Sequence, residues 1–330
     1  NFRNPAVQAY HFDSLRFWLN RGLDGYRLDA VPHLVENNAR DWNDQPESRA
    51  ITKQMQDLIT AYPRRHVVCE ATANPSAYGE PALCGGAFAF GYVEHFVKAA
   101  KGEAASVQKL AEYYRTARPS MATFVSNHDI FAGQRLWDQV AGNEAQYKLA
   151  AASYLLQPGT PFIYYGEEIG MAGIQGLEGD QPLRAPMSWT AEPRGAGFTN
   201  SGKPFRPIAP NGARYNVAAQ LADPQSLLSF YKSMLALRNT FPSLATGSYD
   251  APVVQGRAMA YRRTLGAETT LVAINYGTRP STLTVTGTKP LAAWAAAYPQ
   301  GAKALAANAH GALTLTLPAQ SVQVYRLQQP

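Results

Sequence analysis

The chain has 330 residues, 46% of them hydrophobic, which is enough for two domains with a sizeable core. Its net charge of +6 comes from scattered lysines and arginines, and the local pair Arg262-Arg263 is not interleaved with aromatic residues, so we expect no nucleic-acid partner. No apolar run reaches the roughly eighteen residues of a membrane span, and no signal peptide is visible, so we expect no membrane partner.

Helices and strand-like runs alternate through the first half of the chain. Asn4 and Pro5 are typical of an N-cap and a first helical position, and Gly22 is typical of the end of that helix. Alternation of this kind predicts a parallel sheet covered by helices. The predicted strands are 24–30, 66–70, 86–91, 122–126 and 160–165, and the helices between them are 47–61, 104–116 and 143–157.

The second half of the chain follows a different pattern. Residues 166–222 are rich in glycine and proline without periodicity, which predicts a long functional loop. A helix over 223–240 is followed by short alternating runs that predict an antiparallel β-sandwich over 242–330. The runs are 258–264, 269–275, 281–286, 312–317 and 321–327.

Charged side chains follow three of the predicted strands. Arg27 and Asp29 end the first, Glu70 ends the second, and His128-Asp129 follows the fourth. An ion pair between Arg27 and Asp29 would be a purely structural explanation. The recurrence of acids at strand ends favours a catalytic site instead, because a parallel β/α barrel carries its active site at the carboxyl ends of its strands. Two opposed carboxylates are suited to glycoside hydrolysis.

Four motifs at these places resemble the conserved regions of the α-amylase family of glycoside hydrolases. The segment Gly25–His33 resembles the motif of the fourth barrel strand, and Val68–Ala71 that of the fifth. Phe124–Asp129 resembles the seventh-strand motif, and Gly159–Glu168 the eighth strand and its exit. A further segment, Arg184–Trp189, resembles one found in the α-glucosidase and trehalose-synthase branch.

The resemblance implies a (β/α)8 TIM-barrel fold of which this chain holds strands four to eight. Residues 1–241 would form a partial catalytic barrel and residues 242–330 the β-sandwich domain. The family's third-strand motif Asp-x-x-x-Asn-His is absent, and the chain starts at Asn1 rather than methionine, which indicates a processed or truncated start. A barrel without three strands has open edges, so the missing N-terminal part is a possible partner as a separate chain.

The resemblance also implies a retaining mechanism on α-1,4-linked glucosides. Asp29 would be the nucleophile and Glu70 the acid/base, with their carboxyl groups about 5–5.5 Å apart. We expect Arg27, on the same face of the strand, to keep Asp29 ionised, and the apolar neighbours of Glu70 to raise its pKa. The resemblance assigns Asp129 to the catalytic set, and Arg27, His33 and His128 to substrate binding.

Several alternatives stay open. A transglycosylase or isomerase such as a trehalose synthase shares these residues, and the chain could also be an inactive fragment or a non-catalytic relative. The expected partner is an oligosaccharide or α-glucan. No catalytic cofactor or metal site is expected, although the family habit of a structural Ca²⁺ could apply to the full-length enzyme.

Three further points depend on side chains outside the motifs. Cys69 and Cys84 are expected as two buried thiols, with a disulfide as the less favoured alternative. The compartment is unknown, with a periplasmic or secreted location slightly favoured. The loop aromatics Trp189, Phe198 and Phe205 could either stack on sugar rings or pin the loop to the barrel.

Overall fold

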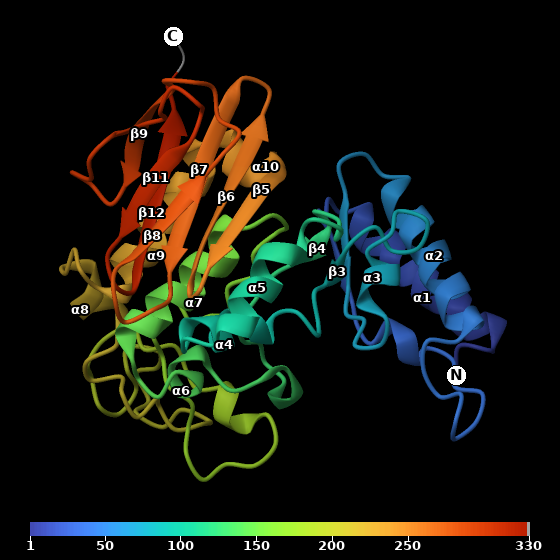
Figure 1. Cartoon of the computed structure of the whole chain (residues 1–330). Helices are drawn as coiled ribbons and strands as arrows, with labels where there is room; N and C mark the ends of the chain where they lie inside the picture. Colours follow the sequence, from blue (N-terminus) through green and yellow to red (C-terminus); the bar gives the residue numbers. More distant parts are fainter. Residues whose placement is uncertain (329–330) are drawn as a thin grey trace. The chain divides into compact units, whose positions relative to one another are not determined.

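The computed structural model describes residues 1–328, and these form two compact units (Figure 1). The first unit contains residues 1–91 and 117–123, and the second contains residues 92–116 and the chain from 124 onward. The domain boundary predicted between residues 241 and 242 therefore falls inside the second unit, and it stays a prediction.

The first unit is built on a parallel sheet of four short strands. Their order is β1-β2-β3-β4, and every adjacent pair is parallel, as the alternation of elements predicted. Leu28 pairs with Cys69 in the β1/β2 ladder, so the next residues, Asp29 and Glu70, leave the same edge of the sheet. The strands are β1 Gly25–Leu28, β2 His66–Cys69, β3 Ala87–Phe88 and β4 Met121–Ala122.

Three helices and a 3₁₀ turn accompany this sheet: α1 Pro5–Leu19, η1 Val31–His33, α2 Pro46–Thr60 and α3 Pro75–Tyr78. The predicted start of α1 is confirmed, since the Asn4 side chain accepts a hydrogen bond from the backbone N–H of Ala6. The spacing of Val7, Tyr10, Leu15, Trp18 and Leu19 predicts one apolar stripe along α1, and this prediction is wrong in part. Tyr10 and Trp18 are 72% and 52% exposed, and the buried residue of the helix is Leu19.

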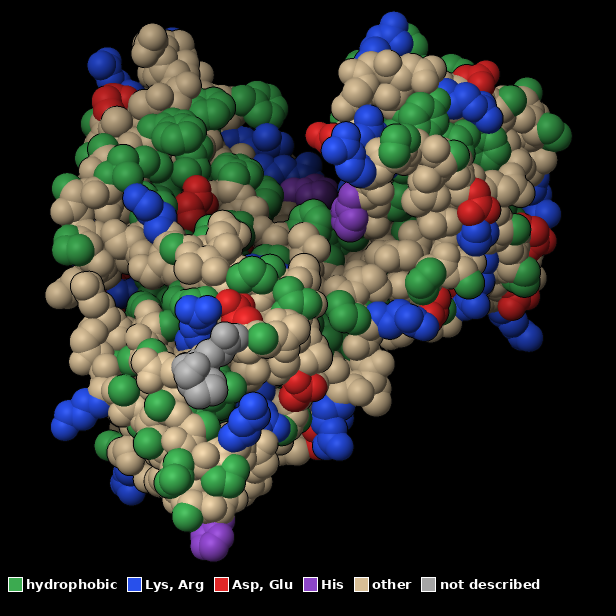
Figure 2. Space-filling model, turned by 90° about the horizontal axis from the view of Figure 1, so that it is seen from above, with side chains coloured by type: hydrophobic (Ala, Val, Ile, Leu, Met, Phe, Trp, Pro, Cys, Tyr) green, Lys and Arg blue, Asp and Glu red, His purple; other side chains and the backbone are tan. Residues whose placement is uncertain are grey.

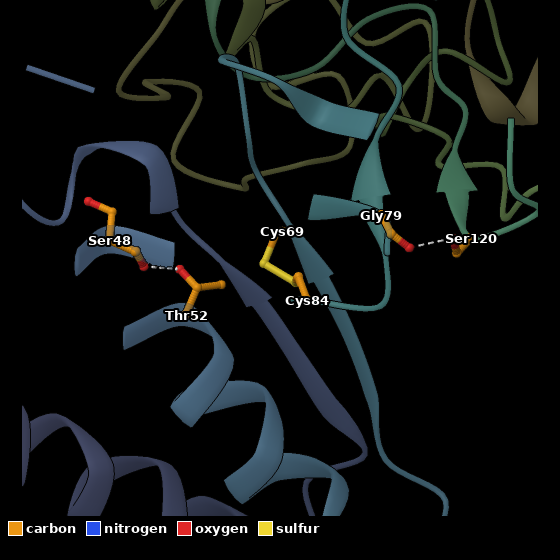
Figure 3. The surroundings of a disulfide bond; sticks show 6 residues. All are labelled: Ser48, Thr52, Cys69, Gly79, Cys84 and Ser120. Carbon is orange, nitrogen blue, oxygen red and sulfur yellow. Dashed lines mark hydrogen bonds between the residues drawn. A yellow bond between two sulfur atoms is a disulfide. The ribbon is translucent and has the colours of Figure 1, made fainter. Parts of the chain in front are cut away.

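A disulfide joins Cys69 and Cys84, which corrects the expectation of two thiols (Figure 3). Cys69 ends β2, and Cys84 lies in the loop that leads to β3. The backbone N–H of Cys69 donates to the carbonyl of Gly86, so this loop returns against the end of β2 and brings the two Cα atoms to 6.4 Å. Spacing along the sequence does not reveal such a return.

The second unit begins with helices that surround α7. This helix is buried on nearly all sides, and the Asn143 side chain caps its N-terminus by accepting from the N–H of Gln146. Ser226 caps α9 in the same way. The helical elements of this unit are α4 Glu94–Ala100, α5 Ala104–Tyr113, η2 Ile130–Ala132, α6 Leu136–Gln139, α7 Glu144–Leu156, η3 Gln181–Leu183, α8 Val217–Leu221, α9 Leu227–Thr240 and α10 Pro242–Thr246.

The strands predicted at 122–126 and 160–165 need correction. β4 ends at Ala122, and residues 162–164 have no regular structure, with only an isolated bridge at Pro161. Proline has no backbone N–H and cannot take part fully in a ladder, although the apolar residues around it resemble a strand. The described residues therefore form four parallel strands where five were predicted.

The long loop over 166–222 is held by its own small core. Ile169, Met171 and Ala185 are buried together with neighbours in this loop. The aromatics Trp189, Phe198 and Phe205 are exposed by 48%, 56% and 92%, so they do not pin the loop.

The C-terminal part contains two antiparallel sheets. A six-stranded sheet has the order β10-β9-β12-β7-β6-β5, and β8 pairs with β11 (Figure 1). Buried residues of both sheets share one core, which includes Leu271, Leu283 and Leu315. The five predicted runs are confirmed as strands, whereas β5, β9 and β10 were missed. The strands are β5 Ser248–Gln255, β6 Ala258–Leu265, β7 Glu268–Asn275, β8 Ser281–Val285, β9 Ala293–Tyr298, β10 Leu305–Ala306, β11 Leu313–Leu317 and β12 Ser321–Leu327.

Buried polar contacts tie these sheets to the helices and explain why one unit holds both. Arg263 of β6 donates to the carbonyl of Leu156 at the end of α7, at 3.3 Å. Tyr276 of the β7 end shares a 2.6 Å hydrogen bond with Ser153 of α7. Cutting the chain at residue 241 would separate these partners and leave buried polar groups unsatisfied.

Candidate active site

Arg27 binds two carboxylates at the carboxyl edge of the parallel sheet. Its Nη1 donates to Oδ1 of Asp29, and its Nη2 donates to Oε2 of Glu70. The Asp29 side chain is 73% exposed, whereas that of Glu70 is 6% exposed. One guanidinium therefore holds an accessible acid and a buried acid together.

Local backbone structure produces this arrangement. Residues two apart on a strand share a face, which places Arg27 beside Asp29. The backbone N–H of Glu70 donates to the carbonyl of Leu28, so the ladder continues just beyond the two strands. Ala30 then takes a left-handed conformation with φ 46° and turns the chain into the 3₁₀ turn η1. A left-handed alanine costs about 1–2 kcal/mol, so the turn after Asp29 is strained.

A pocket of about 480 Å³ lies beside Arg27 and Asp29. Arg27, Asp29 and His33 line it, together with apolar residues of α1 and η1. The His33 ring stacks on Trp42 with the ring centres 5.1 Å apart. Trp42 is half exposed, so this stacked pair forms an aromatic wall within reach of solvent.

The role of Arg27 differs from the expectation. Arg27 was expected to serve Asp29 alone, with Glu70 in an apolar setting. In the structure Glu70 is buried, but the same guanidinium contacts it. The pairing across β1 and β2, which the sequence does not state, brings the second acid within reach.

A second cluster surrounds Asp129. His128 Nε2 lies 3.2 Å from one carboxylate oxygen, and Arg184 Nη2 donates to the other at 3.1 Å. Arg184 also donates to the carbonyl of His128 and to Asp180, both at 3.0 Å. Asp129 is thereby held by two side chains and remains 19% exposed.

The predicted site residues fall into these two clusters. Arg27, Asp29, Glu70 and His33 belong to the first unit. His128 and Asp129 belong to the second.

Sequence reasoning missed the partners of Asp129. Arg184 begins the segment Arg184–Trp189, which was noted for its resemblance to the α-glucosidase and trehalose-synthase branch. That resemblance was the one signal that could have drawn attention to this arginine. Asp180 gave no signal.

Three other properties concern ligands and surfaces. Residues 1–328 contain no group of three or more side chains arranged to hold a metal ion. Within the same residues, no helix combines the length and apolar character needed to cross a bilayer. Basic side chains are spread among other types on the face shown in Figure 2, without a continuous basic stripe.

The sequence matches the family described as "Alpha amylase, catalytic domain" over residues 1–247. The chain belongs to the α-amylase family. This family consists generally of glycoside hydrolases and transglycosylases, and its members include relatives of both kinds. The resemblance drawn from the four motifs is thus confirmed at the level of the family.

Curated relatives carry several different activities in their names. A trehalose synthase/amylase of Mycolicibacterium smegmatis is 32% identical, covering 76% of this chain and 50% of the relative. A salivary α-glucosidase of Anopheles gambiae is 27% identical, covering 88% and 58%. An α-amylase of Bacteroides thetaiotaomicron is 33% identical, covering 74% and 35%. The chain spans between 35% and 58% of the length of these relatives.

Solved structures support the fold. An α-amylase from H. orenii has a TM-score of 0.76 at 23% identity, covering 99% of this chain and 66% of that one. An α-glucosyl transfer enzyme has a TM-score of 0.78 at 23% identity, covering 99% and 68%. These likenesses show the TIM-barrel fold of the family's catalytic domain.

Proposed function

We propose that the protein is a retaining glycoside hydrolase that acts on α-1,4-linked glucosides. The observation that carries the proposal is the bridge from Arg27 to both Asp29 and Glu70. Retaining hydrolysis needs two neighbouring carboxyl groups, one accessible as the nucleophile and one able to hold a proton. The exposed Asp29 and the buried Glu70 suit these two roles.

In the first step, a carboxylate oxygen of Asp29 attacks the anomeric carbon while the bond from that carbon to the leaving oxygen breaks. Glu70 gives its proton to that oxygen. In the second step, Glu70 takes a proton from water, the water oxygen attacks the anomeric carbon, and the bond to Asp29 breaks. Arg27 stabilises the carboxylate form of Asp29 before attack and that of Glu70 after proton donation.

The other proposed residues bind the sugar. Asp129 accepts hydrogen bonds from sugar hydroxyls, and His128 donates to them. The contacts of Arg184 hold Asp129 in one orientation for this task. His33, stacked on Trp42, offers a ring nitrogen at the edge of the pocket beside Asp29.

Replacement of the nucleophile tests the proposal. Asp29→Asn should lower kcat for an aryl α-glucoside at least about 10³-fold, because an amide cannot form the glycosyl-enzyme. Asp24→Asn is a matched control one residue before β1, since the Asp24 side chain is 99% exposed. Proton NMR of the first product should show retained α configuration. Inversion, or an undiminished rate in Asp29→Asn, would overturn the mechanism.

Transglycosylation is the second candidate, and the 32% identity to a trehalose synthase/amylase favours it. Both reactions share the glycosyl-enzyme and differ in whether water or a sugar hydroxyl accepts the glucosyl group. Incubation with maltose distinguishes them. Glucose as the sole product supports hydrolysis, whereas trehalose or a longer oligosaccharide supports transfer.

The exposed face of α1 supports a proposal about the partner. Tyr10, Phe17 and Trp18 are between 46% and 72% exposed, and β1 is an edge strand of its sheet. A closed eight-stranded barrel has no edges. We propose that further barrel strands, on this polypeptide or on a second chain, pair with β1 and that their helices cover α1. Hydrogen exchange in the natural protein tests this, and rapid exchange along β1 would contradict it.

A further inference from the structure

Glu167 lies near the end of the eighth-strand motif Gly159–Glu168, and the proposed mechanism does not use it. Its side chain is 2% exposed, and three neutral hydroxyl groups donate to its carboxylate. Tyr154 and Tyr231 donate to Oε1 at 2.5 and 2.8 Å. Ser126 donates to Oε2 at 2.9 Å. The donors are almost completely buried, so water does not compete for these bonds.

The donors come from separate parts of the second unit. Tyr154 belongs to α7 and Tyr231 to α9, so Oε1 is fixed to two helices. The hydroxyl of Tyr147, also on α7, donates to the backbone carbonyl of Glu167 at 2.6 Å. Ser126 belongs instead to the irregular segment that carries His128 and Asp129. Glu167 therefore connects the helices to this segment.

The segment 126–129 is held at both ends. At one end, Ser126 donates to Glu167. At the other end, Arg184 binds both the carboxylate of Asp129 and the carbonyl of His128. Between them the backbone N–H of Asp129 donates to the side chain of Asn127 at 2.8 Å. The hydrogen bond from Ser126 to Glu167 therefore holds the buried end of the segment against α7 and α9.

We infer that Glu167 is a positioning residue, which fixes the segment 126–129 so that Asp129 and His128 present their side chains to the glucosyl unit. The inference rests on the proposed function, because that proposal assigns the binding of sugar hydroxyls to Asp129 and His128. A displacement of about 1 Å in a substrate-contacting group can cost about 10²-fold in rate. The expected effect of releasing Ser126 is therefore on turnover as well as on stability.

Two substitutions at Glu167 separate the contact from the charge. Glu167→Ala removes every bond and should lower kcat/KM for an aryl α-glucoside about 10–100-fold, mainly through kcat. Glu167→Gln should restore kcat/KM to within about 3-fold of the wild type. The glutamine oxygen can accept from both tyrosines, and its amide can donate to Ser126 Oγ.

A matched control shows what a purely structural role would look like. Tyr276→Phe removes another buried hydroxyl that is bonded to α7, through Ser153 at 2.6 Å. It should lower the Tm without changing kcat/KM of the folded protein. If Glu167→Ala behaves like this control, the inference is wrong. If Glu167→Ala does not fold, Ser126→Ala tests the same link with a single lost bond, and an unchanged kcat/KM would be equally decisive.

A double-mutant cycle with Asp129→Asn completes the test, with all variants made in the natural protein. If Glu167 acts through the segment, Glu167→Ala should add less than about 3-fold to the loss already caused by Asp129→Asn. Full multiplication of the two losses would overturn the inference. A wild type without activity on any α-glucoside would instead refute the proposed function, so the two failures are distinguishable.

Discussion

Glu70 and Glu167 are both buried, with 5% and 2% of their surface exposed, but their partners differ in kind. Glu70 contacts the guanidinium of Arg27, which also binds Asp29. Glu167 is surrounded by the hydroxyls of Ser126, Tyr154 and Tyr231. Burial alone therefore does not distinguish the proposed acid/base from the proposed positioning residue.

A guanidinium and a hydroxyl group have different effects on the charge of a buried carboxyl group. A cation stabilises the ionised form, so a carboxyl group beside Arg27 can release a proton when the chemistry requires it. Hydroxyl donors supply direction without charge, and desolvation then dominates. Burial raises the pKa of Glu167 to about 7, and the hydrogen bonds from Tyr154 and Tyr231 oppose this shift. Glu167 is suited to holding a shape, and Glu70 to changing charge.

The largest expected effect comes from removing the guanidinium of Arg27, which binds Asp29 and Glu70. Arg27→Met leaves two neighbouring carboxylates without their shared cation, so kcat/KM for an aryl α-glucoside should fall about 10³-fold. Arg16→Met is the control, because Arg16 pairs with Asp13 on the exposed surface of α1. A fall of less than about 3-fold in Arg27→Met would show that the bridge is structural.

The next largest effect concerns the contribution of Glu167 to the free energy of unfolding of the protein. The folded pKa of Glu167 is raised to about 7 from the ordinary 4.5, so the folded state binds more protons between these values. Its contribution to the free energy of unfolding is present below pH 4.5 and is lost as the pH rises through 7. The loss amounts to about 3 kcal/mol.

Urea unfolding of the wild type and of Glu167→Gln at pH 5 and pH 8 measures this loss. The neutral glutamine should be favoured over glutamate at pH 8 by about 2–3 kcal/mol more than at pH 5. Glu168, whose pKa burial also raises, is present in both proteins, and its charge is one of the causes that raise the pKa of Glu167. A difference between the two proteins that does not vary with pH would contradict the raised pKa.

The sequence predicted the acids at strand ends better than their surroundings. Asp29 and Glu70 could be identified because an acid after a short apolar run is unusual, and the motifs around them are specific. The shared use of Arg27 could not be predicted, because it depends on the register of β1 against β2. The role of Glu167 was missed for the same reason, since its donors are separated from it by between 13 and 64 residues.

Helices and strands were likewise predicted better where the signal is local in the sequence. The helix α1, capped by Asn4, was predicted at its first residue, whereas α9, capped by Ser226, begins at Leu227 rather than at the predicted residue 223. The strand predicted at 160–165 does not form as a regular strand in the structure. Its apolar residues fit the strand pattern, but Pro161 weakens the pairing. The disulfide at Cys69 was also missed as the favoured state, since it forms through a loop that returns to β2.

The smallest expected effect concerns the backbone beside Asp29. Ala30 has φ 46°, and a glycine there would relieve about 1–2 kcal/mol of strain while losing about 0.5–1 kcal/mol to the greater freedom of the unfolded chain. Ala30→Gly should therefore raise the free energy of unfolding by about 0.5–1 kcal/mol, measured in urea. Because the turn fixes the backbone that carries the proposed nucleophile, kcat should fall by about 2–5-fold at the same time.

Ala141→Gly is the matched control, because Ala141 has φ 50° in the loop before α7. It should give the same gain in stability without a change in kcat. Equal kcat values for both variants would mean that the strained turn is not needed to hold Asp29 in place. A gain in stability from Ala30→Gly with a loss of turnover would instead show that strain beside the exposed acid is retained for its effect on the reaction.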